Sequence, residues 1–517
     1  MRIRSKALGA AAAAGALVVA GCSTPGASTG SAAAGDSGAG GTLVMSTPTA
    51  PDSLDATIAN TFAARLVFSS MCEGLFTVDS NLKVVPQLAA ETPKISADGL
   101  TMDIKLKQGV KFSDGTPFDA AAVVTTLERN LTKKGSARVQ ELSAVASVKA
   151  VDPTSVQLKL KRPSAPLAAQ LSDRAGLIMS PTALQKEGDD FGKNPSCVGP
   201  FKFKSMVAGN EIALVKDPNY YDADKVKLAG VTYKFITDSS VATANLQSGD
   251  INAAEHIVPS DAEKLKSAGL EALTSKTIAY QGISINVSPS IGTPLSKSAD
   301  LRKAFEMSID REALNKSVWG GSKVTDCNPL PVQSEFYTKV ECTPFDVEGA
   351  KKLVAASGVP TPVPVELMAS SSAVALREAQ VVQSMAGAVG FKVNIKQLDL
   401  VSALQIARAG KADAFIVGWS GRVDPDGNTN DLLTTGGSNN FSELADPQVD
   451  SLIQKAGSTN DNAQRKTLYA EALKKVADIR SNIYLYHDTW FLGTAKNVTG
   501  IDYRTNGIPY LKTASVG

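Results

Sequence analysis

The chain has 517 residues, with 53 Lys and Arg against 51 Asp and Glu. A nearly neutral chain without a basic run gives no sign of a nucleic-acid partner. Its length is enough for two or more domains.

The N-terminus has the three parts of a secretory signal. Arg2, Arg4 and Lys6 precede an apolar run over 7–20, and Gly21 then precedes Cys22. The run is too short to span a bilayer, which takes roughly 20 apolar residues. The ending Val-Ala-Gly-Cys resembles the lipobox of bacterial lipoproteins, in which the cysteine receives a lipid. We therefore predict a signal peptide over 1–21 and lipidation of Cys22, with an ordinary signal peptide as the alternative.

The segment after Cys22 consists almost wholly of Ser, Gly, Ala and Thr up to Gly41. Such a segment cannot pack a core and is typical of a flexible tether. We predict a lipidated tether over 22–41 and a folded body from about Thr42. The protein is then extracytoplasmic and anchored by lipid to the cell membrane, in a periplasm or on the outer face of the cytoplasmic membrane.

Strand-like and helix-like patterns alternate along the folded body. In 101–107, for example, Met102, Ile104 and Leu106 alternate with polar residues, which predicts a strand with one buried face. In chain order the patterns predict a strand over 101–107, a helix over 120–131, strands over 156–160 and 280–287, helices over 301–309 and 379–389, strands around 393–395 and over 413–419, a helix over 463–476 and a strand over 483–486. This alternation indicates a mixed α/β fold.

Four cysteines remain after Cys22, an even number that suits an oxidising compartment. Cys327 and Cys342 flank a short Pro-rich loop, so we pair them and, by elimination, pair Cys72 with Cys197. Four cysteines allow three pairings, and free buried cysteines are the alternative.

Signatures of catalysis and of metal or cofactor binding are missing from the sequence. The chain has two histidines, His256 and His487, far apart and without metal-ligand spacing. We find no phosphate-binding Gly-rich loop and no serine-hydrolase elbow. We therefore predict a binding protein without catalytic residues, metal or cofactor. A hydrolase that uses paired carboxylates stays open, because carboxylates are plentiful.

Several short segments together resemble family 5 of the bacterial extracellular solute-binding proteins, the peptide- and nickel-binding receptors of ABC importers. They follow in the family's order over most of the chain. These segments are 51–55 (PDSLD), 72–75 (CEGL), 85–89 (VPQLA), 109–118 (GVKFSDGTPF), 199–201 (GPF), 217–221 (DPNYY), 246–250 (LQSGD), 301–304 (LRKA) and 309–312 (IDRE).

The resemblance implies a two-lobed periplasmic-binding-protein-like α/β fold (type II, cluster C) with an extra subdomain in lobe one. Lobe one is then 42–279 plus 490–517, and lobe two is 280–489, with hinge strands near 280–286 and 483–488. It also implies a monomer that binds a small-molecule or peptide ligand and works with an ABC permease and ATPase.

The polar loop after the predicted strand 413–419 is the best site candidate, because α/β folds bind ligands at the carboxyl ends of buried strands. In peptide-binding relatives the first Asp of this loop pairs with the peptide's α-ammonium group. Here Arg422 stands in that place, and Asp424 survives from the later part of the motif. Arg422 favours a carboxylate or phosphate; the alternative is that it pairs with Asp424 or Asp426 and only shapes the loop. Trp419 is predicted to be a ligand-stacking wall or, alternatively, core.

Four further residues are weaker candidates for ligand contact. Asn439 and Asn440 resemble a polar stretch that lines the family's cleft, with a surface turn as the alternative. Tyr280 and Asn286 flank the predicted hinge.

These observations predict a substrate-binding lipoprotein of an ABC importer that captures a peptide or a peptide-like small solute. In one form of this prediction the solute is anionic. A receptor for a nickel chelate or another non-peptide solute is the first alternative. A surface lipoprotein enzyme on the same fold is the second, because fold does not determine function.

Overall fold

The two longest strands of the chain, β12 (Glu271–Ile285) and β17 (Asn482–Thr494), lie side by side and antiparallel. They belong to the computed structural model of the protein, which describes residues 40–517. The predicted signal peptide and Cys22 lie outside the described residues.

β12 and β17 form the middle of an eleven-stranded sheet. Its order is β15-β14-β16-β12-β17-β11-β1-β10-β9-β8, and β13 pairs with β17. The remaining strands of this sheet are β1 (Gly40–Thr47), β8 (Phe201–Val207), β9 (Glu211–Lys216), β10 (Leu228–Phe235), β11 (Ala253–Ala254), β13 (Val324–Thr325), β14 (Val363–Ser370), β15 (Phe391–Leu398) and β16 (Ala414–Trp419). The sheet mixes parallel and antiparallel pairs, as the alternating sequence patterns predict.

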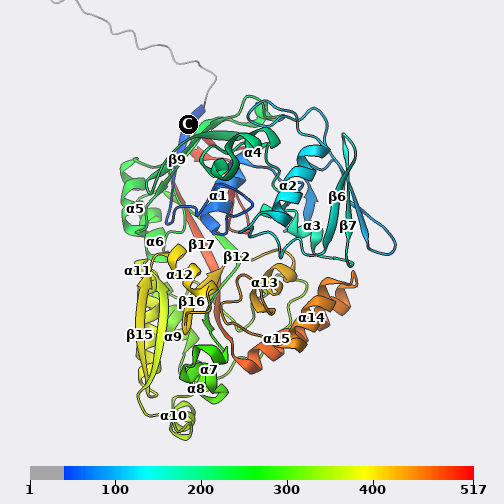
Figure 1. The fold of residues 1–517 in the computed structure, drawn as a ribbon. Coiled ribbons are helices and arrows are strands. Elements are labelled where there is room, and N and C mark those ends of the chain that lie inside the picture. Colours follow the sequence, from blue (N-terminus) through cyan, green and yellow to red (C-terminus); the bar gives the residue numbers. More distant parts are fainter. Residues whose placement is uncertain (1–39) are drawn as a thin grey trace, which may run out of the picture. The chain divides into compact units, whose positions relative to one another are not determined.

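Two large hydrophobic cores lie along this sheet. The first is built from residues between Leu43 and Ala253 and closes on C-terminal residues such as Leu492 and Leu511. The second is built from residues between Ile283 and Tyr486. We call the elements around these cores the first and the second lobe. β12 and β17 run from one into the other (Figure 1), whereas the predicted lobe boundaries stay predictions.

The first lobe contains a separate four-stranded sheet in the order β4-β5-β7-β6. Helix α2 packs on this sheet through Val123 and Leu127, and the Asp119 side chain caps its N-terminus by accepting a hydrogen bond from the Ala122 amide. The strands are β4 (Lys94–Ile95), β5 (Thr101–Lys105), β6 (Val145–Asp152) and β7 (Ser155–Leu160). The helices of this lobe are α1 (Phe62–Met71), α2 (Ala120–Thr132), α3 (Leu167–Gln170), α4 (Pro181–Glu187), α5 (Ser239–Ser248) and α6 (Pro259–Ser267).

The second lobe places helices around strands β14, β15 and β16. A smaller core, built around Leu433, Val449 and Tyr469, joins α13, α14 and α15. The helices of this lobe are α7 (Pro294–Lys297), α8 (Ala299–Met307), α9 (Arg311–Trp319), α10 (Val347–Ala356), α11 (Ala373–Gly387), α12 (Leu400–Arg408), α13 (Asn430–Leu433), α14 (Pro447–Gly457) and α15 (Asn462–Ile479).

Both predicted disulfides are present, Cys72–Cys197 and Cys327–Cys342. The first closes a loop of 125 residues within the first lobe and the second a loop of 15 residues in the second lobe. Each bond therefore restricts the unfolded chain of one lobe without tying the two lobes together.

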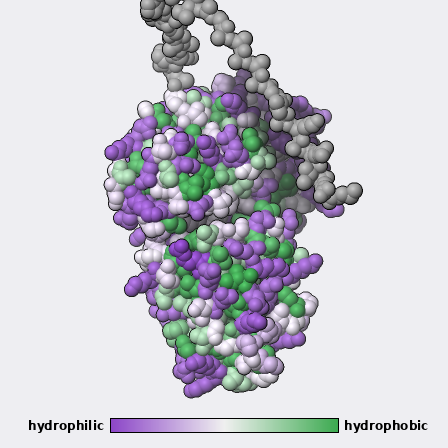
Figure 2. Space-filling model, turned by 90° about the vertical axis from the view of Figure 1, so that its left-hand side faces the viewer, coloured by the Kyte–Doolittle hydropathy of each residue, from purple (hydrophilic) through white to green (hydrophobic). Residues whose placement is uncertain are grey.

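The surface mixes hydrophilic and hydrophobic residues on the face that Figure 2 shows. Within residues 40–517, no helix combines the length and the apolar character that a membrane crossing requires.

Candidate functional site

The loop after β16 is held in shape by its own hydrogen bonds. Asn428 accepts hydrogen bonds from Trp419 Nε1 at 3.1 Å and from the Arg422 amide at 2.7 Å, and its Nδ2 donates to the Arg422 carbonyl at 2.8 Å. Gly421 has φ +74°, and a Cβ atom there would lie 2.3 Å from the Ile278 carbonyl oxygen. The loop therefore presents the Arg422 side chain in one direction, toward the first lobe.

Arg422 pairs with a residue of the other lobe. Its Nε lies 3.2 Å from Asp173 Oδ2, and its guanidinium carbon lies 4.4 Å from the centre of the Trp419 ring. The alternative prediction that Arg422 pairs with Asp424 or Asp426 is wrong. Asp424 instead accepts two hydrogen bonds from Arg465 Nη2 of α15, at 2.6 and 2.9 Å.

The first lobe contributes a segment and a helix that face this loop. Asp173 caps the short 3-10 helix that follows α3, and Arg65 projects from α1. Arg65 Nη2 lies 3.0 Å from Asp173 Oδ2, and its Nη1 donates to Ser420 Oγ at 3.2 Å. Gln170 Nε2 donates to Asp426 Oδ2 at 3.0 Å. Charged and polar side chains thus join the two lobes directly.

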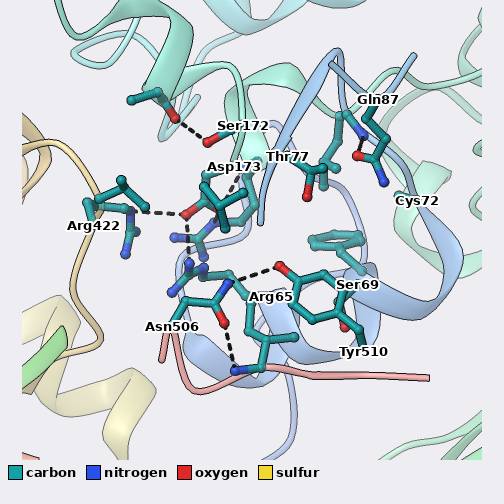
Figure 3. Close-up of a pocket in the computed structure, with 18 residues that line it drawn as sticks. Arg65, Ser69, Cys72, Thr77, Gln87, Ser172, Asp173, Arg422, Asn506 and Tyr510 are labelled. Atoms are coloured by element: carbon teal, nitrogen blue, oxygen red, sulfur yellow. Dashed lines mark hydrogen bonds and ion pairs between the residues drawn. The ribbon is translucent and has the colours of Figure 1, made fainter. Parts of the chain in front are cut away.

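Two adjoining cavities lie at this junction and share Arg422 and Asp173. We call the first, of about 70 Å³, the basic cavity. Figure 3 shows its wall, which includes Arg65, Asp173, Arg422, Gln87, Asn506 and Tyr510. The second, of about 40 Å³, we call the acidic cavity; its wall includes Trp419, Glu141, Asp424, Asp426 and Asp431.

Positive charge exceeds negative charge in the basic cavity. Burial and the neighbouring arginines lower the pKa of Arg174 well below its usual value, although Asp173 opposes this. Burial lowers the pKa of Arg422 to about 10, against the opposing charge of Asp173. Burial alone would raise the pKa of Asp173, but Arg65, Arg422 and Arg174 hold it well below its usual value. A small anion placed here is stabilised by guanidinium groups that one carboxylate does not neutralise.

Carboxyl groups gather in the wall of the acidic cavity. Burial and the charge of Asp424 raise the pKa of Asp426 to about 7. Burial also raises the pKa of Asp431, although hydrogen bonds from Asn439 and Ser438 oppose the shift. Neither carboxylate has an ion-pair partner within residues 40–517. This end of the cleft favours a cationic or hydrogen-bond-donating group.

The structure places three predicted site residues on cavity walls and four elsewhere. Trp419 and Asp424 line the acidic cavity, and Arg422 lines both cavities. Trp419 also packs against the core of α13–α15, so it belongs to both the wall and the core.

The other four residues are engaged in internal contacts and line neither cavity. Asn440 is 6% exposed, and its side chain donates to the Thr434 and Leu444 carbonyls. Asn439 accepts from Arg408 Nη2 at 3.0 Å. Tyr280 packs edge-on against Tyr484, and Asn286 donates to the Gly410 carbonyl at 3.0 Å. These contacts give each of the four side chains a structural partner.

Sequence reasoning missed Arg65, Asp173 and Arg174. They lie in segments without a functional motif, and only folding brings them to Arg422. Within residues 40–517, no three His, Cys, Asp or Glu side chains form a group that suits a metal ion.

The model of the bacterial extracellular solute-binding proteins, family 5, matches residues 83–441, well over half of the chain. The chain belongs to this family. Two similar relatives are the glutathione-binding proteins GsiB of Pectobacterium atrosepticum and of Salmonella typhimurium. Each is 29% identical over 461 residues, which cover 87% of this chain and 89% of the relative.

Solved structures share the fold of this family 5 protein. AgaA from A. tumefacien R10, in complex with agropinic acid, is 25% identical with a TM-score of 0.83. NikZ from Campylobacter jejuni, in complex with Ni(L-His), is 24% identical with a TM-score of 0.83. Both matches cover 92% of this chain and 99% of the other. The predicted family and the two-lobed α/β fold are confirmed.

Proposed function

We propose that this chain is the substrate-binding lipoprotein of an ABC importer. It captures a peptide or a peptide-like small solute between its two lobes and delivers it to a membrane permease and ATPase. The observation that carries the proposal is the pair of cavities whose walls come from both lobes, with Arg422 of one lobe held to Asp173 and Arg65 of the other. Contacts to both lobes favour the closed form of a two-lobed receptor, because the open form cannot make them together.

The names of the relatives support a solute of this class. GsiB is a glutathione-binding protein, and AgaA was solved with agropinic acid. Peptide complexes are known for other proteins of this fold, such as AppA from Bacillus subtilis with a nonapeptide. We propose that this chain binds its solute without converting it, because it belongs to a family of solute-binding proteins.

Native mass spectrometry of the protein purified from its own host tests the binding function. We expect a small molecule at one copy per chain, lost in Arg422→Ala. The proposal fails if repeated preparations carry no small molecule and if no peptide or organic acid raises the melting temperature. Hydrolysis of a peptide by the pure protein over repeated turnovers would instead favour a surface enzyme on this fold.

The lipid anchor is a separate part of the proposal, supported by the residues around Cys22. A lipoprotein carries two or more acyl chains, which hold a protein at a membrane far more stably than one chain. We expect the wild-type protein in the membrane fraction and Cys22→Ser in the soluble fraction. Equal partition of the two forms would exclude lipidation at Cys22.

A further inference from the structure

We propose that Arg65 and Arg422, which face each other across the cleft, form an anion subsite that binds a carboxylate group of the solute beside Asp173. This inference rests on the proposed function and adds to it the charge of the group that the basic cavity recognises. Arg174 also lines the cavity, with its Nε 3.7 Å from Asp173 Oδ1, and Asp173 is the internal counter-ion of the subsite.

The two arginines come from different lobes and meet at the same carboxylate oxygen. Arg65 Nη2 lies 3.0 Å and Arg422 Nε 3.2 Å from Asp173 Oδ2. Arg65 and Arg422 also reach the same hydroxyl, since both donate to Ser420 Oγ, at 3.2 and 3.3 Å. An anion at this point therefore contacts both lobes at once, which favours the closed form.

The charges at this point do not cancel. Arg65, Arg174 and Arg422 surround the single carboxylate of Asp173, so two positive charges remain. The nearby Arg138 does not change this balance, because it pairs with Glu141 at 2.6 Å. Buried charge is costly unless it is paired, so the cluster gains stability from an added anion.

Several donors at the cavity make no hydrogen bond within residues 40–517, although Arg174 Nε lies 3.7 Å from Asp173 Oδ1. The Nε atoms of Arg65 and Arg174 are buried without a hydrogen bond, and these residues are only 8% and 1% exposed. Tyr510 Oη accepts a hydrogen bond from Asn506 Nδ2 at 2.9 Å, which leaves its own proton free to donate (Figure 3). Gln87 uses its carbonyl oxygen to accept from the Gly74 amide at 2.9 Å, so its NH2 group is also available. The cavity wall is rich in donors and suits an acceptor-only group.

A carboxylate fits these donors in number and size. It is planar, accepts up to four hydrogen bonds and pairs side-on with guanidinium groups. The basic cavity of about 70 Å³ has room for ~5 water-sized spheres, which is enough for a carboxylate and its first carbon atoms. The remainder of the solute then extends past Trp419 and Arg422 into the acidic cavity, where Asp426 favours a donor.

Binding of matched peptide pairs tests the subsite. Calorimetric titration compares Met-Leu and glutathione with the same peptides amidated at their carboxyl ends, and thermal unfolding with acetate or succinate at constant ionic strength supplies a fragment probe. We expect the free acids to bind at least about tenfold tighter than the amides, and succinate to raise the melting temperature.

Two variants distinguish an anion-binding site from an ion pair that only holds the two lobes together. In Arg422→Gln we expect the preference for the acid to fall at least about tenfold, because one of two facing charges is lost. In Asp173→Asn we expect equal or tighter binding of the acid, because a repelling carboxylate is removed. If the ion pair of Arg422 and Asp173 only holds the lobes together, both variants weaken binding to the same extent. Arg377→Gln, on the exposed side of α11, is the matched control and leaves the preference unchanged.

The outcomes distinguish this inference from the proposed function. If peptides bind but acids and amides bind equally, or if Arg422→Gln and Arg377→Gln behave alike, the anion subsite is wrong and the binding function stands. If no peptide, succinate or co-purifying molecule stabilises the wild-type chain, both fail. Circular dichroism confirms that each variant is folded before it is compared.

Discussion

Asp173 and Asp426 are largely buried carboxylates that line adjoining cavities, yet their pKa values move in opposite directions. Burial favours the neutral acid in both. At Asp173 the charges of three arginines outweigh burial and hold the pKa well below its usual value. At Asp426 the nearby charge of Asp424 adds to burial, and the pKa rises to about 7. Neighbouring charge, rather than depth, decides which of the two carboxyl groups is ionised.

The two cavities therefore present different charges at the two ends of the cleft. The basic cavity carries excess positive charge, and the acidic cavity carries carboxylates without ion-pair partners in the described part of the chain. A solute with an anionic end and a donor or cationic end gains from both cavities in one orientation only. Charge complementarity of this kind contributes to specificity as well as to affinity.

The largest expected effect comes from the ion pair that supports the acidic end, Asp424 with Arg465. The Arg465 side chain is 4% exposed. In Arg465→Ala we expect a loss of about 3–5 kcal/mol in the free energy of unfolding, because Asp424 is left buried without a cation beside Asp426. Urea unfolding monitored by circular dichroism measures it.

The double variant Asp424→Asn with Arg465→Ala completes this test. It should recover part of the lost stability, since the stranded charge is gone. Lys474→Ala is the control, because its pair with Asp478 is exposed and such pairs contribute about 0–1 kcal/mol. If the losses in free energy of unfolding of the two single variants sum to the loss of the double variant, Asp424 and Arg465 are not coupled.

The second prediction sets the two carboxylates against each other as pH changes. A raised pKa in the folded state means that Asp426 favours folding at low pH and loses that contribution as pH rises toward about 7. The stability of the wild type relative to Asp426→Asn should therefore fall between pH 4 and 7.5. The interval from 3.8 to about 7 sets an upper limit of ~4 kcal/mol on this fall.

Asp173→Asn is the matched comparison, with the same substitution in the same cleft. The depressed pKa of Asp173 means that its contribution is complete above its usual value and is lost only in stronger acid. The difference in the free energy of unfolding between Asp173→Asn and the wild type should stay constant from pH 5 to 8. Glu378, another buried carboxylate with a pKa raised to about 7, is present in all three proteins and cancels. If the stability of the two variants relative to the wild type changed with pH in the same way, the opposite pKa shifts of Asp426 and Asp173 would be contradicted.

The smallest expected effect concerns the hydrogen bond across the acidic end, Gln170 to Asp426. In Gln170→Ala we expect about fivefold weaker binding of whichever peptide the wild type binds, because closing the lobes no longer forms a bond worth ~1 kcal/mol. Calorimetry measures the change. Gln157→Ala, which removes a similar bond to Asp103 within the first lobe, should leave affinity unchanged. Equal losses in both variants would mean that the bond does not contribute to closure.

Local patterns predicted most of the secondary structure. The strand predicted over 413–419 is β16 (Ala414–Trp419), and the helix predicted over 120–131 is α2 (Ala120–Thr132). The predicted strands at 280 and 483 are correct in place but too short, because β12 begins at Glu271 and β17 continues to Thr494. Register shifts within this pair interrupt the alternation that marks a strand in the sequence.

The sequence by itself determined the family, the alternation of strands and helices and the presence of Arg422 in the loop after β16, because each depends on neighbouring residues or on ordered motifs. Only the tertiary structure decided the partner of Arg422. Arg65 and Asp173 lie far from it along the chain, so no local pattern marks them, and their charges act on Arg422 only after folding brings the atoms within about 3 Å. The polarity of the cleft is for this reason a property of the fold and not of any one segment.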